Sequence, residues 1–448
     1  MKATAAAVLA SSLLLTPLAQ GGSGGVQEVR VRVGRSLKMV VVRGLDLQIL
    51  APGHPLRTGV SEPRTARVSK VEITRLAGDF WQLEWPSSGE RERIQAPSLT
   101  IKGVMVRMGV KPVPNVIEIL PDRGREIDVI ARLDVETYLA GVIPAEMPVS
   151  WPLEALKAQA VAARSFALRM ALERRKQAAR YDVESTVLDQ VYQFADTANR
   201  SARWEARLQR VLGETRGEVL KAPNGRILKA FYSADCGCQS EDPKFVWGEL
   251  KSFESVKDPT CESRKPTTWD LTVKRSQVRE RLVAALDLPA TAELRALHVG
   301  SRTPSGRVAQ VVASLDVDEN RRRFFLSAQE FRKIFGFDEI RSTNFTLQWM
   351  ARDLRIQGTG LGHGVGLCQL GAKTLAEEGK TYREILKLYY PRASLRKTMV
   401  SAVAGPSVLS QVAQADRVRY PAHIEPDQTV NRVELTVLTK GQKAHAQF

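Results

Sequence analysis

The chain has 448 residues, 43% of them apolar, so it is long enough to bury one large core or two to three smaller ones. It carries 66 Lys and Arg against 49 Asp and Glu, and this net charge of +17 favours anionic partners such as nucleic acid, an anionic membrane or an acidic wall polymer. The basic residues are scattered without a nucleic-acid-binding signature, which argues against nucleic acid as the partner.

The first 19 residues predict a signal peptide that is removed after export. Lys2 supplies a positive charge, and the apolar stretch that follows is too short to span a bilayer and ends in small residues near Ala19. Residues 20–27 contain GGSGG, which is typical of a flexible linker. No later apolar run is long enough for a membrane helix. We therefore expect an exported chain without a membrane anchor, in the periplasm or cell-wall space, under oxidising conditions.

Short strands are predicted throughout residues 28–121. Runs such as VRVRVG, LKMVVVRG and FWQLEW are rich in β-formers and end at or near Gly or Pro. A further strand, EIDVIARL, leads to Asp134. We predict a β-rich N-terminal part over 28–121, a core over 122–392 and a C-terminal tail over 393–448 to which the sequence assigns no role.

A long helix is predicted from about Pro152 to Ala179, because apolar residues recur there every three or four positions. Glu146 precedes this helix between Pro144 and Pro148, which restrict backbone dihedrals and lack amide donors. The two prolines predict that Glu146 stands in a stiff loop at the helix entrance, an arrangement that suits a residue that meets a substrate. The alternative is that Glu146 is one of many surface acids.

The segment 358–366, GTGLGHGVG, is rich in glycines that free the backbone for close approach to a ligand. No set of its glycines matches G-x-G-x-x-G, which argues against a dinucleotide loop. His363, one of five histidines, stands among these glycines, and we favour a ligand-facing role for it over a structural one. Two helices are predicted to follow, over 368–378 and 382–389. Mixed helices and strands over 269–354 complete an α+β protein with a strand-rich body.

Four cysteines, Cys236, Cys238, Cys261 and Cys368, allow three pairings if all are oxidised. An exported chain favours a disulfide, and Cys236 with Cys261 is the preferred pair. The alternative is a zinc site made by Cys236, Cys238, Cys261 and His363, although C-x-C is a weaker zinc signal than C-x-x-C. Cys368 reads as a small buried residue. Apart from this zinc alternative, we expect no cofactor.

Four segments, in this order, resemble the SpoIID/LytB family: YLAGVIPAEMPVSWPLEALKAQAVAARSFAL, DQVY, FYSADCGCQSED followed by VWG, and GHGVGLCQLGA. Its members include the sporulation protein SpoIID, a peptidoglycan lytic transglycosylase, and LytB-type amidase enhancers. The resemblance extends from about Val29 to Pro391. Two residues depart from the family pattern, since Cys368 stands where Ser is usual and Cys238 where Gly is usual.

The resemblance implies a SpoIID-like fold and names Glu146 as the catalytic acid and base on glycan strands. It also implies that a substrate groove is lined by Lys157, Arg164, Tyr192, Ser233, His363 and Gln369. One acid suffices for a lytic transglycosylase, because the C6 hydroxyl of MurNAc is the internal nucleophile and leaves a 1,6-anhydro end. Lys157 and Arg164 are seven residues apart and so share a helix face, where they either contact the glycan or simply cover the helix surface.

Two other functions remain open at this point. The chain resembles amidase enhancers as well, so it is alternatively a protein that binds peptidoglycan without cutting it and stimulates a cell-wall amidase. A zinc-dependent wall hydrolase is disfavoured, because the sequence lacks H-E-x-x-H or a comparable histidine-rich ligand set.

Overall fold

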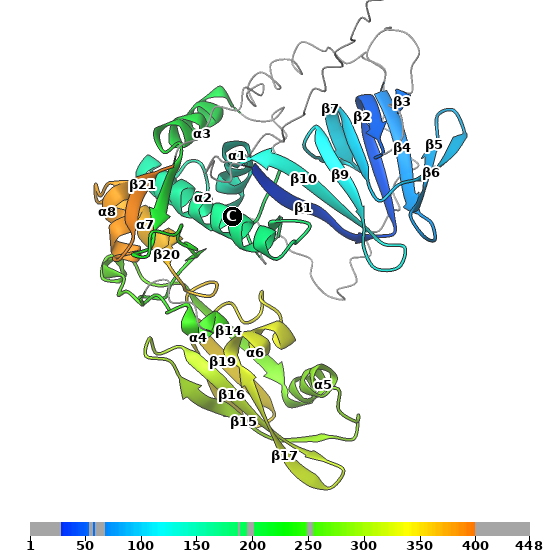
Figure 1. Ribbon diagram of the computed structural model, residues 1–448. Coiled ribbons are helices and arrows are strands. Elements are labelled where there is room, and N and C mark those ends of the chain that lie inside the picture. The colour runs from blue at the N-terminus through cyan, green and yellow to red at the C-terminus, as the bar shows by residue number, and fades with distance from the viewer. Residues whose placement is uncertain are drawn as a thin grey trace, which may run out of the picture. The chain divides into compact units, whose positions relative to one another are not determined.

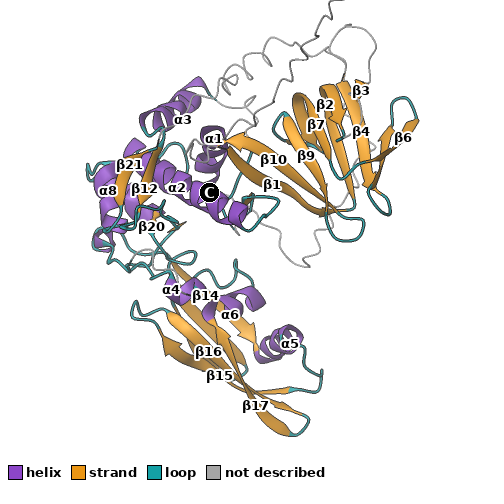
Figure 2. Cartoon of the chain, viewed as in Figure 1, coloured by secondary structure: helices purple, strands orange, loops and turns teal. Residues whose placement is uncertain are grey.

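The computed structural model describes residues 28–52, 57–58, 68–186, 189–194, 201–248 and 254–398. The predicted signal peptide, the linker and most of the predicted tail lie outside these residues. Within them the protein is a strand-rich α+β fold with eight α-helices, which confirms the predicted fold class (Figures 1 and 2). Buried apolar side chains form three clusters, here called the helical, inserted and N-terminal clusters.

The N-terminal part is one large sheet whose main path runs β11-β1-β10-β9-β7-β2-β4-β5-β6. These strands are β1 Glu28–Leu37, β2 Met39–Leu50, β4 Val68–Arg75, β5 Phe80–Trp85, β6 Glu90–Gln95, β7 Leu99–Met108, β9 Val116–Pro121, β10 Ile127–Asp134 and β11 Val183–Glu184. The short β3 (Arg57–Thr58) pairs with β2, and β8 (Lys111–Pro112) pairs with β7. Every strand predicted from the sequence up to Asp134 is present, and the sheet continues without a break past residue 121.

Strand β10 joins this sheet to the helices. Ile127 and Val129 in its first half belong to the N-terminal cluster, whereas Ala131 and Leu133 in its second half belong to the helical cluster. The antiparallel register pairs Glu28 with Asp134, so β10 delivers the chain directly into the first helix. The sheet therefore fixes where that helix begins.

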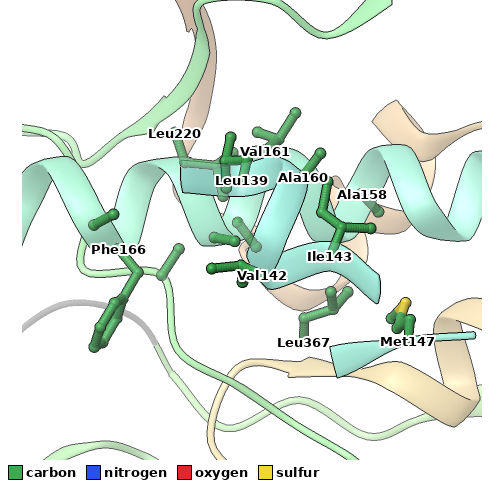
Figure 3. Packing of buried hydrophobic residues seen from close by; sticks show 14 of the residues in the cluster. Leu139, Val142, Ile143, Met147, Ala158, Ala160, Val161, Phe166, Leu220 and Leu367 are labelled. Atoms are coloured by element: carbon green, nitrogen blue, oxygen red, sulfur yellow. The ribbon is translucent and has the colours of Figure 1, made fainter. Parts of the chain in front are cut away.

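The helical cluster surrounds α2, Leu153–Lys176, which matches the long helix predicted from the sequence. Helices α1 (Val135–Glu146), α3 (Ala202–Glu214), α7 (Gln369–Glu377) and α8 (Tyr382–Tyr389) contact it. Small residues on α2, such as Ala158 and Ala160, allow Val142 and Ile143 of α1 to pack closely (Figure 3). Because α2 is buried on nearly all sides, its polar side chains require partners inside the fold.

Two short strand pairs complete the helical part. β12 (Glu218–Lys221) pairs antiparallel with β21 (Ser394–Lys397), so the start of the predicted tail belongs to this part of the fold. β13 (Tyr232–Ser233) pairs in parallel with β20 (Leu367–Cys368), with Ser233 opposite Cys368. The second pair brings together segments more than 130 residues apart in sequence.

The segment between β13 and β20 contains a subdomain with its own core. A sheet of β14 (Thr268–Lys274), β19 (Asp353–Thr359) and β18 (Phe345–Met350) stands beside a second sheet of β15 (Glu293–Arg302), β16 (Val308–Val317) and β17 (Asn320–Ser327). Helices α5 (Arg275–Ala285) and α6 (Ala328–Phe335) complete it. Gly358 is required here, since a Cβ at that position would lie 2.2 Å from the Trp269 ring. The sequence predicted the mixed elements but not this separation.

Candidate functional site

Glu146 is the last residue of α1, not part of a loop. Asp134 caps the start of the helix by accepting hydrogen bonds from the amides of Glu136 and Thr137. The helix continues through Pro144, and the amide of Met147 closes its last turn on the Ile143 carbonyl at 2.9 Å. The prediction of a stiff loop is therefore wrong, because a proline in the last helical turn costs one hydrogen bond without ending the helix. The helix itself holds Glu146.

Three donors reach the Glu146 carboxyl group from three segments. The amide of Val191 donates to Oε1 at 2.8 Å, and the side chains of Tyr232 and Gln369 also form hydrogen bonds with the carboxyl group. Burial raises the pKa of Glu146 above its ordinary value, and these three hydrogen bonds act in the opposite direction. Burial outweighs the three hydrogen bonds, so the net effect of the site is a raised pKa of Glu146.

The Tyr232 hydroxyl is positioned by a buried hydrogen-bond chain. Gln190 donates from Nε2 to the Tyr232 hydroxyl oxygen at 3.0 Å, and the Tyr138 hydroxyl donates to Gln190 Oε1, also at 3.0 Å. With its oxygen occupied by Gln190, Tyr232 points its proton toward Glu146. Gln190 and Tyr232 were not predicted as site residues, although the quoted DQVY and FYS segments contain them.

His363 lies beside Tyr232 in the loop before β20. Its Nδ1 accepts from the Val365 amide at 3.0 Å, so the proton of the neutral ring is on Nε2. Burial, reinforced by the positive charges of Arg332 and Arg307, lowers the pKa of His363 to about 3, and a hydrogen bond with the Tyr232 backbone opposes this effect. His363 is therefore a neutral imidazole next to the segment that carries Tyr232.

Trp247, in the short helix α4 (Lys244–Trp247), extends the aromatic surface around His363. Its ring stacks on Phe231 with a centroid distance of 4.1 Å and meets His363 edge-on at 4.9 Å. The Trp247 side chain is 44% exposed. An exposed ring fixed in this way is a suitable surface for an apolar sugar face. Trp247 belongs to the VWG segment that resembles the family, but the sequence did not predict it as a site residue.

Three further predicted site residues lie around Glu146 or its partners. Gln369 opens α7 and is buried, with Nε2 3.5 Å from Gln159 Oε1. Ser233 is also buried, and its Oγ has no hydrogen-bond partner among the described residues. Tyr192 follows Val191 and stacks on Tyr138 at 5.4 Å, so it supports the hydrogen-bond chain from behind.

Lys157 and Arg164 are buried and paired with carboxylates inside the helical part, so their predicted groove-lining role is wrong. Lys157 pairs with Glu154 at 2.6 Å and with Glu214 of α3 at 2.5 Å. Arg164 is fully buried and forms two hydrogen bonds with Glu136, at 2.7 and 2.9 Å. Both cations compensate carboxylates within the helical part, because α2 is enclosed by other elements.

The predicted Cys236–Cys261 disulfide is also wrong, since the disulfide joins Cys238 to Cys261. Spacing could not separate the two, because Cys236 and Cys238 differ by only two positions. The alternative zinc set is not assembled either, as two of its three sulfurs, those of Cys238 and Cys261, are bonded to each other. Cys236 and Cys368 are buried free thiols.

The site can be compared with known proteins. Residues 123–221 match the model of the family described as stage II sporulation protein (SpoIID), and residues 248–366 match a domain of unknown function (DUF8618). Glu146 and α2 lie within the first match, and the inserted subdomain lies within the second.

Several curated proteins are similar over somewhat more than half of the chain. An uncharacterized protein of Brachyspira hyodysenteriae is 32% identical over 58% of this chain and 66% of its own length. An amidase enhancer of Bacillus subtilis is 29% identical over 57% of this chain and 40% of its own length. Stage II sporulation protein D of the same species is 28% identical over 58% of this chain and 74% of its own length. The chain thus spans less than two thirds of the length of the first two relatives.

Among the helices of the described residues, none combines the length and the apolar character that crossing a membrane requires.

Proposed function

The chain belongs to the SpoIID/LytB family, and from this we propose that it is an exported lytic transglycosylase that cleaves the MurNAc–GlcNAc bond of peptidoglycan glycan strands. The observation that carries the proposal is the setting of Glu146. Burial raises the pKa of its carboxyl group, which favours the protonated form that a general acid requires, and three donors are in place to hold its anion.

In the first step Glu146 gives its proton to the glycosidic oxygen. The bond between that oxygen and C1 of MurNAc then breaks, and positive charge develops on the sugar ring. The Glu146 anion is stabilised by the Val191 amide, the Tyr232 hydroxyl and the Gln369 side chain. These donors lower the free energy of the state in which the proton has left.

In the second step the C6 hydroxyl of MurNAc attacks C1. Its proton passes to the Glu146 carboxylate, which restores the acid and leaves a 1,6-anhydro end. The neighbouring carboxyl group of Asp189 is engaged elsewhere, since its Oδ2 accepts from the Glu184 amide at 2.8 Å. One carboxyl group is sufficient because the nucleophile belongs to the substrate.

Two further features fit a glycan substrate. The exposed Trp247 ring offers a stacking surface for a sugar face, and His363, which is held by the Val365 amide and the Tyr232 backbone, packs against the edge of that ring. The net charge of +17 favours approach to an anionic wall.

The test compares Glu146→Gln with Glu377→Gln, a surface change on α7. Both variants and the unmodified protein are incubated with purified glycan strands, and the products are identified by mass analysis. We expect anhydro ends from the unmodified protein and from Glu377→Gln, and none from Glu146→Gln, while sedimentation with glycan persists for all three. Equal release of anhydro ends by Glu146→Gln would refute the assignment.

A second candidate is favoured by the relative named amidase enhancer. In this function the same surface binds peptidoglycan, and the partner is a cell-wall amidase. The Glu146→Gln variant separates the two functions, because an enhancer retains its stimulation of an added amidase when the carboxyl group is replaced. Stimulation without anhydro products from any variant would favour the enhancer.

A further inference from the structure

Two thiols that take no part in the disulfide lie side by side near the pairing of β13 with β20. Cys236 follows β13, and Cys368 ends β20 and caps α7. Their sulfurs and a carboxylate oxygen of Asp235 all lie within 4.8 Å of one another, and both cysteines are fully buried. The cleavage chemistry proposed above uses neither thiol.

The sulfur of Cys368 is surrounded by hydrogen-bond donors. The Cys236 amide is 3.3 Å away, the Gly371 amide at the start of α7 is 3.4 Å away, and the Arg264 guanidinium is 3.3 Å away. The Cys368 thiol in turn donates to Asp235 Oδ1 at 3.9 Å, and this carboxylate is also paired with Arg264 at 3.0 Å. The Cys368 sulfur is thus held by three donors and one carboxylate acceptor at the point where β20 ends and α7 begins.

Cys236 has a different set of partners. Its thiol donates to Asp258 Oδ2 at 3.3 Å. A hydrogen bond with Cys368, burial and the nearby negative charges raise the pKa of Cys236. The two sulfurs therefore differ in their surroundings: Cys368 accepts from three donors, whereas the Cys236 thiol donates to a carboxylate.

A metal ion is the competing interpretation of this cluster, because Asp235, Cys236 and Cys368 are potential ligands. However, the Arg264 guanidinium already occupies both Asp235 and Cys368, and it brings a positive charge to within hydrogen-bond distance of each. This charge opposes binding of a cation. The arrangement favours thiol chemistry over metal ligation.

We propose that Cys236 and Cys368 are a redox pair that closes to a second disulfide, with Cys368 as the reacting sulfur and Cys236 as the resolving sulfur. The oxidant is a small hydroperoxide such as hydrogen peroxide. The Cys368 thiol gives its proton to Asp235, and its sulfur attacks a peroxide oxygen. The O–O bond breaks, and the leaving hydroxide takes up this proton as water, which gives a sulfenic acid. Cys236 then gives its proton to Asp258, and its sulfur attacks the Cys368 sulfur. The S–O bond breaks, and the leaving hydroxide takes up this proton as the second water. Two thiols and one peroxide thus give one disulfide and two waters.

The position of the pair gives the bond a structural consequence. Cys236 and Cys368 stand at the two ends of residues 237–367, which contain the inserted subdomain. The parallel strands β13 and β20 meet at the same place, with Ser233 opposite Cys368. A Cys236–Cys368 bond would therefore fasten the base of the subdomain and the start of α7 covalently to β13, and would stabilise the folded chain against unfolding.

The test treats the purified full-length chain with one equivalent of hydrogen peroxide. We expect its intact mass to fall by two hydrogen atoms, its two free thiols to disappear, and its melting temperature to rise. A protein already oxidised on purification supports the proposal equally, and is then reduced and reoxidised. Proteolysis of the Cys238→Ser, Cys261→Ser double variant should yield Cys236 and Cys368 in one cross-linked peptide.

Single variants assign the two roles independently of glycan cleavage. Cys236→Ser should stop at a sulfenic acid that a dimedone probe traps, whereas Cys368→Ser should not react with one equivalent of peroxide. Circular dichroism establishes that both variants are folded. The proposal would be overturned if both thiols of the unmodified chain remained free after peroxide treatment, or if the Cys368→Ser variant reacted with peroxide as fast as the unmodified chain. Loss of anhydro products would not bear on it, because every readout is a property of the thiols.

Discussion

Replacing Arg164 by Met should destabilise the helical part strongly without directly removing a substrate contact. Arg164 is fully buried, donates twice to Glu136, and also donates to the Glu218 carbonyl at 3.1 Å. Removal of one partner from a buried pair costs about 3–5 kcal/mol, because the other charge remains buried without compensation. We therefore expect Arg164→Met to lower the free energy of unfolding by about 4 kcal/mol.

Urea unfolding followed by tryptophan fluorescence measures this loss, since Trp151 and Trp204 pack against the helical cluster. The matched control is Arg169→Met on the same helix, where the pair with Glu173 is partly exposed and should contribute less than about 1 kcal/mol.

A double variant, Glu136→Leu with Arg164→Met, should recover much of the stability lost by Arg164→Met alone, because no buried charge is then left unpaired. Glycan cleavage should recover with it. An Arg164→Met protein of unchanged stability that fails to bind or cleave glycan would refute the structural assignment and restore a substrate-contacting role for Arg164.

Three other changes should have measurable effects. Burial raises the pKa of Glu146, so ionisation of this group opposes folding as pH rises through that pKa. Glu146→Gln should therefore melt at a higher temperature than the unmodified protein at neutral pH, and the difference in melting temperature should vanish below about pH 4. A difference that does not depend on pH would contradict this. Trp247→Ala should weaken glycan binding by roughly tenfold in a sedimentation assay, because it removes the exposed ring proposed to stack on sugar, and should leave the melting temperature unchanged. Phe325→Ala, which removes another exposed ring, should not change binding. Gly141→Ala should lower the melting temperature and the rate of cleavage together, because the new Cβ would lie 2.5 Å from the Tyr192 ring; retention of both would show that the ring can move aside at little cost.

Local patterns predicted the elements around the site well. The strands up to Asp134 and α2 were predicted from their periodicity, and α8 occupies the predicted range. The end of α1 was not predicted, since a proline usually marks a helix boundary and only the hydrogen bond from Met147 to Ile143 shows that the last turn is intact. A helix end cannot be predicted from local sequence where the surrounding fold compensates for a residue that is locally unfavourable, such as Pro144.

The errors at Lys157 and Arg164 have a shared physical origin. Their spacing correctly placed them on one face of α2, but spacing does not show what covers that face. Glu136 of α1 and Glu214 of α3, which compensate the two charges, are distant in sequence. The disulfide partner of Cys261 was likewise decided by the path of the chain, because the sequence offered two candidates with nearly the same loop length.

The partners of Glu146 explain why the two ends of the inserted segment matter to the site. Tyr232 reaches the carboxyl group from the chain before the insertion and Gln369 from the chain after it, and the pairing of β13 with β20 holds both in place. Closing so long a loop would cost conformational entropy if the loop were unstructured. Instead the subdomain folds around its own core and pairs Thr268 with Thr359, so its two ends already lie together. The core of the subdomain, although it does not touch Glu146, thereby helps to bring Tyr232 and Gln369 to the Glu146 carboxyl group.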